Sequence, residues 1–202
     1  MKYKNIFLND SLFQKDPDIN SDHTLNENME YFQNNYPENF FYIDRFPRLV
    51  NDFDKYSQLE VFYSQDGDND VYKSEEKKFI SVISKLWVYS ETVVESSIYS
   101  EDDITIQSEE HPEDPFFLEE FKTEELVNIT NIEKLTGVLK LALRGKIWAC
   151  LIINDLSIVI WCNDLLLGVY FEDSAKYKPL VQSICTTEGL YLRSFTEGDS
   201  ME

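Results

Sequence analysis

The feature that most constrains the fold is a set of three apolar segments of seven residues each: 147–153, 156–162 and 165–171. Asn-Asp pairs at positions 154–155 and 163–164 separate them, and both residue types tolerate the positive φ angles of tight turns. The aspartates also argue against a membrane span, because each would cost about 2.5–3.5 kcal/mol deep in a bilayer. The pattern predicts a three-stranded antiparallel meander over about 147–171. Since both faces of each strand are apolar, we expect a sheet that is covered on both sides or that lies centrally in the fold.

Helical signals flank the meander. Asn131 is a good N-cap for a helix over 132–144, where apolar residues recur at a spacing near 3.6. Pro179 fits the first turn of a second helix over 180–187, and residues 190–195 are expected to form one more strand. This order of helices and strands predicts an α+β fold.

No Gly- or Ser-rich linker demands a domain boundary, so we expect a single α+β domain over residues 1–202. Its central antiparallel meander should be packed by helices, with a scaffold core over about 131–195. Gly145 and Gly189 stand where left-handed residues would end the two C-terminal helices. The N-terminal patterns predict these elements: helices at 25–36, 47–57 and from Ser74 to about 94, and strands at 40–43 and 59–64.

The charge of the chain is strongly negative and unevenly spread. There are 38 acidic and 18 basic residues, which give a formal net charge of −20. Residues 1–130 hold 29 acidic and 11 basic residues, whereas residues 131–202 hold 9 and 7. Nucleic-acid phosphates and anionic membranes repel such a chain, so we expect neither as a partner. The charge leaves cations, basic proteins or nothing charged as natural partners, and of these we expect a basic protein.

The densest acidic stretch is 91–125, where Lys122 is the one basic residue among 13 acidic ones. One hypothesis is a solvated segment that only confers solubility. The other is a docking surface for a basic partner over about 95–125, because the interleaved apolar and aromatic residues, Phe121 among them, would suit a solvating tail poorly. The candidate partner-binding residues are Tyr99, Glu101, Asp102, Asp103, Glu109, Glu110, Glu113, Asp114, Phe116, Phe117, Glu119 and Glu120.

The sequence carries no motif for catalysis. It lacks a glycine-rich phosphate loop, a GxSxG nucleophile elbow and an HExxH zinc motif, and its two histidines are His23 and His111. Residues 66–70 begin like a calcium-binding loop, but Val71 and Lys77 stand where that loop requires Gly and Glu. We therefore expect a protein that is not an enzyme, with no catalytic residue, no metal ion and no cofactor.

The cysteines and the N-terminal residues bear on the compartment. Cys150, Cys162 and Cys185 lie among apolar residues without a CxxC pair, which is typical of small buried thiols in a reducing cytoplasm. Cys150 and Cys162 lie on neighbouring predicted strands, so a disulfide between them stays open. The first ten residues lack the apolar run of a signal peptide, and the expected location is cytoplasmic.

A small, acidic, aromatic-rich α+β chain without catalytic motifs resembles the bacterial immunity proteins of contact-dependent and related polymorphic toxin systems. The acidic and aromatic stretch 101–125 and the compact core 131–195 carry the resemblance. It implies a cytoplasmic toxin inhibitor, or antitoxin, of bacterial competition that binds and neutralises a basic nuclease toxin domain, in our expectation as a 1:1 complex. Nuclease toxins bind phosphates through Lys and Arg, so an acidic surface can occupy the same groove.

Two alternative functions stay open at this point. A nucleic-acid mimic directed at a DNA-binding protein would use the same negative charge, but it needs carboxylates spaced like phosphates over a long surface. The second alternative is a ligand-binding domain or an enzyme whose pocket leaves no sequence motif. A partner recovered from the native host would discriminate among these hypotheses.

Overall fold

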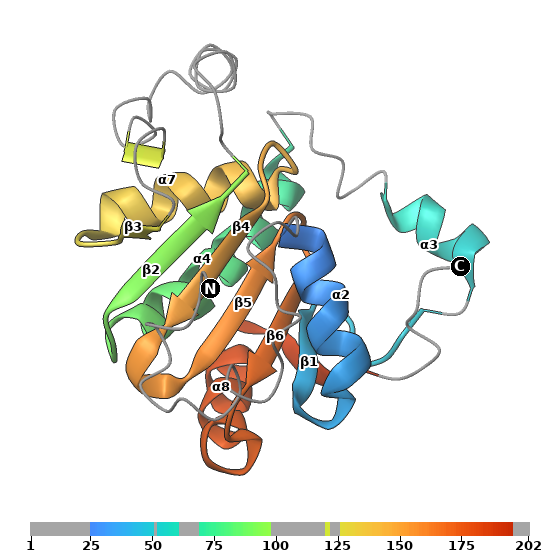
Figure 1. Ribbon diagram of the computed structural model, residues 1–202. Helices are drawn as coiled ribbons and strands as arrows, with labels where there is room; N and C mark the ends of the chain where they lie inside the picture. Colours follow the sequence, from blue (N-terminus) through green and yellow to red (C-terminus); the bar gives the residue numbers. More distant parts are fainter. Residues whose placement is uncertain (1–24, 51, 61–68, 98–119, 122–125, 196–202) are drawn as a thin grey trace.

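A seven-stranded sheet is the centre of the structure, a computed structural model that describes residues 25–50, 52–60, 69–97, 120–121 and 126–195. The strand order within these residues is β3-β2-β4-β5-β6-β1-β7, and every neighbouring pair is antiparallel (Figure 1). The strands are β1 (Phe40–Asp44), β2 (Thr92–Ser96), β3 (Val127–Asn128), β4 (Ala149–Ile153), β5 (Ile158–Cys162), β6 (Leu167–Phe171) and β7 (Tyr191–Ser194).

The predicted meander is confirmed. Strands β4, β5 and β6 pair in chain order, with Ile152 opposite Val159 and Ile160 opposite Val169. Every residue of the three strands is buried, as their two-sided apolar pattern predicted. The polar residues between the segments form the turns at the sheet ends, where their backbone groups can reach water.

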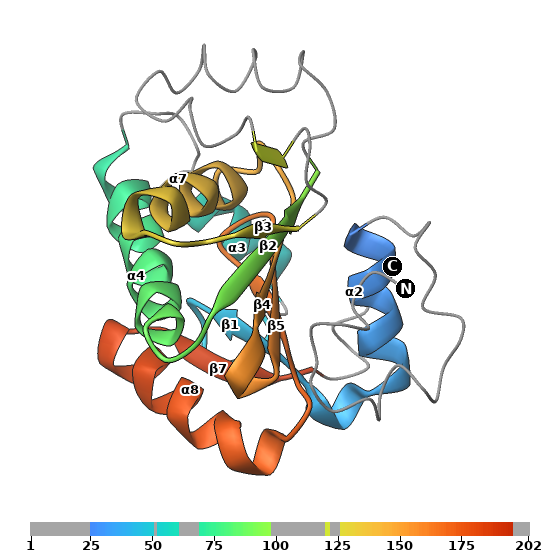
Figure 2. The same cartoon turned by 60° about the vertical axis from the view of Figure 1, so that its left-hand side comes forward.

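Helices cover both faces of this sheet, which confirms the α+β fold. One face is covered by α4 (Asp70–Trp87), α7 (Ile132–Leu143) and α8 (Ser174–Glu188), and the opposite face by α2 (Leu25–Asn35) (Figure 2). A buried ion pair ties α4 to α7, since Arg144 Nε and Nη2 lie 2.7 and 3.1 Å from the two carboxylate oxygens of Glu76. The carboxylate of Glu76 is thereby satisfied although its residue is only 4% exposed.

The face under α2 is packed by aromatic rings. The ring of Phe32, from α2, lies 4.6 Å from that of Tyr170 and 5.2 Å from that of Trp161, between ring centroids. Gly168 lies beneath this cluster, and a Cβ atom there would sit 2.8 Å from Cζ of Phe40. A glycine is therefore required at this position for Phe40 and α2 to approach β6 closely.

Both C-terminal helices are present: α7 ends one residue before its predicted bound, and α8 is longer than predicted. The side chain of Asn131 caps α7 by accepting from the N–H of Lys134 at 2.8 Å, as predicted. Helix α8 begins at Ser174 instead of 180, because Asp173 caps it, so Pro179 lies inside the helix and not in its first turn. Gly145 (φ 65°) and Gly189 (φ 76°) adopt the predicted left-handed conformation.

The long helix after residue 70 was predicted with wrong ends. It is capped by Asn69, whose Oδ1 accepts from the N–H groups of Val71 and Tyr72 at 2.9 and 3.2 Å, and not by Ser74. It ends at Trp87, and Val94 belongs to β2, where it pairs with Leu151. The β-branched residues after the helix gain more from a place beside β4 than from extending the helix.

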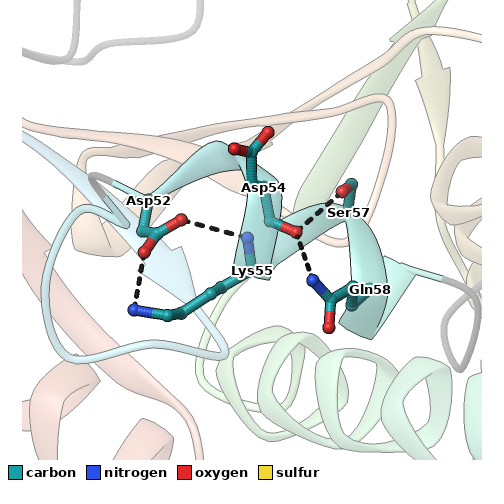
Figure 3. A network of polar contacts seen from close by, with 5 residues as sticks. All are labelled: Asp52, Asp54, Lys55, Ser57 and Gln58. Carbon is teal, nitrogen blue, oxygen red and sulfur yellow. Dashed lines mark hydrogen bonds and ion pairs between the residues drawn. The ribbon is translucent and has the colours of Figure 1, made fainter.

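Helix α3 (Phe53–Glu60) replaces part of a predicted strand. Leu59 lies in this helix, so the strand expected at 59–64 is wrong there, and residues 61–64 lie outside the described residues. The helix begins with local bonds (Figure 3): the Asp52 carboxylate accepts from the N–H of Lys55 at 3.1 Å and pairs with its ammonium at 2.7 Å. These bonds lower the pKa of Asp52. All five side chains drawn are exposed, so the network stabilises the helix start and encloses no site.

The structure corrects one local expectation about the meander and settles one open alternative. The positive φ of the first turn falls on Ser157 (φ 47°), because residues Asn154–Leu156 form a 3₁₀ turn that moves the left-handed position to its end. Cys150 pairs with Trp161, whereas Cys162 pairs with Ala149, the residue before Cys150. Successive strand residues point to opposite faces, so the two thiols lie on opposite sides of the sheet and form no disulfide.

Replacing Ile160 with Asp should unfold the protein. The side chain of Ile160 is fully buried in the central strand, and an unpaired charge there costs more than a typical domain stability of about 5–15 kcal/mol. Urea denaturation followed by circular dichroism would measure the effect. Leu166→Asp is the matched control, because Leu166 is 38% exposed in the next turn, and this variant should keep its cooperative transition. A folded Ile160→Asp variant of wild-type stability would contradict the described sheet.

Candidate functional site

The acidic stretch lies in a connection that the strand pairing does not require. Strands β2 and β3 are antiparallel neighbours, with Val93 opposite Asn128 and Val94 opposite Val127. A two-residue turn can join such a pair, yet residues 97–126 link them here. This segment, which we call the acidic connection, holds 11 acidic residues and one basic residue. Connections of this length within a compact domain are most often functional or disordered.

The acidic connection begins at a firm anchor on the sheet. The backbone N–H of Ser97 donates to the carbonyl of Trp148 at 2.9 Å, and its hydroxyl accepts from the N–H of Trp148 at 2.9 Å. These two bonds extend the pairing of β2 with β4 by one residue. The chain therefore leaves the sheet from a fixed point beside β4.

A second anchor holds the returning end of the connection. Phe121 is 6% exposed and belongs to the core on the side of α4 and α7. The adjacent carboxylate of Glu120 pairs with the ammonium of Lys134, in the first turn of α7. Lys134 also donates to the carbonyl of Asn128 at 3.2 Å. The returning chain is thus held by one apolar and one charged contact.

Of the twelve predicted partner-binding residues, Glu120 lies within the described residues, and its side chain is 51% exposed. It is paired with Lys134 and still presents half of its surface to solvent. The other predicted residues lie outside the described residues: Tyr99, Glu101, Asp102, Asp103, Glu109, Glu110, Glu113, Asp114, Phe116, Phe117 and Glu119. Their place in the site stays a prediction.

Two residues of the predicted acidic and aromatic region have structural places instead. Glu95 lies in β2 and is 2% exposed, so residues 95–96 belong to the sheet and not to a docking surface. Phe121, one of the aromatic residues interleaved with the acidic ones, has its ring buried in the core. Both placements have one cause, because the acidic pattern continues into segments whose apolar neighbours belong to the scaffold.

The described scaffold contributes little of the net charge. Its residues include 19 acidic and 14 basic ones, whereas the remaining residues include 19 acidic and 4 basic ones. Several scaffold charges are paired with one another: Lys78 with Glu75 at 2.6 Å, Arg193 with Asp44 at 2.8 Å, Arg144 with Glu76, and Lys85 with Glu188. The unbalanced negative charge therefore lies mostly outside the described scaffold, with much of it in the acidic connection.

Burial suppresses four of the potential nucleophiles among the described residues. Desolvation raises the pKa of Cys185 to about 12 and that of Cys162 further above its ordinary range, with the nearby Asp164 adding to the rise at Cys162. Desolvation likewise raises the pKa values of Tyr72 and Tyr170. At neutral pH these four groups are protonated, so none is poised as a nucleophile or base.

The described residues bring together no group of three His, Cys, Asp or Glu side chains that could hold a metal ion. Asn69 and Asp70, from the calcium-like sequence, form the cap and first residue of α4, while Asp66 and Asp68 lie outside the described residues. His23 and His111 lie outside them as well. The described part of the chain thus offers an anchored acidic connection as its candidate site.

Comparison of the chain with protein-family models, with curated proteins and with solved structures finds no match. The functional argument therefore rests on the residues themselves. Among the described residues, no helix is both long enough and apolar enough to cross a membrane.

Sequence reasoning overlooked Ser97, Trp148 and Lys134, the residues that anchor the connection. The signal that could have revealed Lys134 was a lysine three residues after the N-cap Asn131, a place that favours acids.

The native thiols should resist alkylation. Cys150, Cys162 and Cys185 are buried, and the raised pKa values at Cys162 and Cys185 leave almost no thiolate near neutral pH. Iodoacetamide labelling at about pH 8, measured by mass spectrometry, should give negligible labelling of the folded protein and labelling of all three cysteines in concentrated guanidinium chloride, where the pKa returns to about 8.5. Rapid labelling of one cysteine in the folded state would contradict the described burial.

Proposed function

We propose that the protein is an immunity protein, a cytoplasmic inhibitor that binds a basic nuclease toxin domain in a 1:1 complex and neutralises it. The observation that carries the proposal is the acidic connection, which holds 11 acidic residues against one basic residue in a link that the strand pairing does not need. A scaffold whose charges are largely balanced carries this connection between two anchors. Such an arrangement suits a protein that presents a charged surface to a partner.

The proposal assigns different roles to carboxylates and to aromatic rings: the carboxylates speed association and the rings supply affinity. Opposed fields raise association rates by about 10–10³-fold, and salt weakens the effect. Affinity depends more on a few desolvated anchors near the centre of an interface, which are often aromatic. Tyr99, Phe116 and Phe117 lie among the carboxylates in sequence and are the proposed anchors.

Recovery of the partner is the first test of this proposal. The protein would be affinity-purified from its native host at low and at high salt, and the bound proteins identified by mass spectrometry. We expect one basic nuclease domain, bound at low salt, whose toxicity on expression in a bacterial cell is suppressed by this chain. Recovery of a DNA-binding protein without toxicity would favour a nucleic-acid mimic. A partner that is acidic or neutral would overturn the proposal.

Neutralising four acids of the connection should slow association with the partner. Changing Asp102, Asp103, Glu109 and Glu110 to Asn or Gln weakens the local field, so the association rate at low salt should fall about tenfold or more and its salt dependence should flatten. Stopped-flow kinetics at two salt concentrations would measure both.

The matched control removes the same number of charges from exposed scaffold positions, by changing Glu38, Asp54, Asp70 and Asp155 to Asn or Gln. Its association rate should stay within about threefold of wild type, because surface charges away from the docking surface are largely screened. If the two quadruple variants slow association equally, the net charge matters and the acidic connection is not the docking surface.

Truncating an aromatic anchor should change the dissociation rate and not the association rate. Phe116→Ala or Phe117→Ala should speed dissociation by about 30-fold, as expected for the loss of a hot-spot residue worth about 2 kcal/mol, and should leave the association rate nearly unchanged. Surface plasmon resonance at physiological salt would measure both rates. Tyr191→Ala is the control, since Tyr191 is 45% exposed on β7, away from β2 in the sheet order. Unchanged dissociation in both Phe variants would remove these residues from the interface.

A further inference from the structure

Lys134 occupies a position where a lysine is electrostatically unfavourable. It is the third residue of α7, and its own N–H is bonded to the N-cap side chain of Asn131. The first turn of a helix carries partial positive charge and favours carboxylates. Lys134 is also 7% exposed, and burying an ammonium costs free energy unless it is paired. A cation placed there needs a compensating contact.

Two contacts compensate this cation, one from the chain before it returns to the sheet and one from strand β3 itself. The ammonium pairs with the carboxylate of Glu120, which precedes the return, and donates to the carbonyl of Asn128, in β3. Helix α7 itself does not use the ammonium, because an ammonium only donates hydrogen bonds, whereas the N–H groups at a helix start need an acceptor such as the side chain of Asn131. The long side chain thus joins the start of α7 to both ends of the segment from Glu120 to Asn128.

We propose that Lys134 is a positioning residue that fixes the returning end of the acidic connection to the scaffold. The anchor is a property of the isolated chain. Its consequence rests on the proposed function: with residues 120–121 already fixed before a basic partner arrives, less conformational entropy is lost on binding. Glu120, half exposed beside Lys134, marks the point where the anchored scaffold meets the partner-facing surface.

Hydrogen exchange of the isolated protein tests the anchor. In Lys134→Met, exchange of the backbone amides in residues 120–121 and 126–129 should speed up by about tenfold, the change expected from losing one charge-assisted hydrogen bond. Amides of β4, β5 and β6 should exchange at wild-type rates. Lys134→Arg keeps the cation and should restore most of the protection. Unchanged exchange in residues 120–129 of Lys134→Met would overturn the proposal.

Two further variants keep this test decisive. Glu120→Gln removes the same pair from its half-exposed side and should give the same local increase if Lys134→Met fails to fold. Lys85→Met removes a second lysine–glutamate pair, with Glu188, that lies between α4 and α8. This control should leave exchange in residues 120–129 unchanged, whereas an equal increase there would show a general loss of stability and contradict a local anchor.

Binding kinetics separate this inference from the proposed function. With the basic partner recovered from the host, Lys134→Met should weaken affinity about tenfold while its unfolding midpoint in urea stays near wild type, and Lys134→Arg should recover the affinity. Faster exchange with unchanged affinity would refute the positioning role and keep the immunity function. Faster exchange in a chain that binds no basic protein would refute the immunity function and keep the anchor.

Discussion

The two-sided apolar character of strands β4, β5 and β6 is the constraint on which the rest of the structure depends. Every residue of these strands is buried, so cover is needed on both faces. On one face three helices, α4, α7 and α8, provide it, and the Glu76–Arg144 pair fixes two of them against each other. On the other face α2 approaches closely enough to bring Phe32 against Trp161, which is possible because residue 168 is a glycine.

The pairing of the sheet also explains where the fold accommodates the acidic connection. Strand β2 pairs with β4 along its whole length, and on its other side Val93 and Val94 pair with the two residues of β3. The long connection between β2 and β3 therefore leaves and rejoins the sheet near its edge, without interrupting the central pairs. Ser97 and Trp148 fix its start, and Phe121 with Lys134 fixes its end. A charged segment held this way can serve binding while the core supplies stability.

The sequence predicted the C-terminal half well, because its signals are local. Asn131, Gly145 and Gly189 act through neighbouring backbone groups, and the apolar segments keep the strand period. The helix cap at Ser74 and the strand at 59–64 were predicted wrongly. In both places the local residues suit more than one secondary structure, and the packing of the whole chain decides between them. The candidate site was predicted as a charged region, but its anchors were not, because the Lys134–Glu120 pair and the burial of Phe121 arise from contacts that the chain makes only after folding.

The central proposal is that a basic partner binds the acidic connection and not the helices α4, α7 and α8 that cover one face of the sheet. Hydrogen exchange of the protein, alone and in complex with the partner recovered from its host, would map the contact peptide by peptide. The account predicts slower exchange in the complex across residues 98–121, with the exposed surfaces of α4 and α8 unchanged. Protection confined to α4 and α8, with exchange across 98–121 unaltered by the partner, would contradict it.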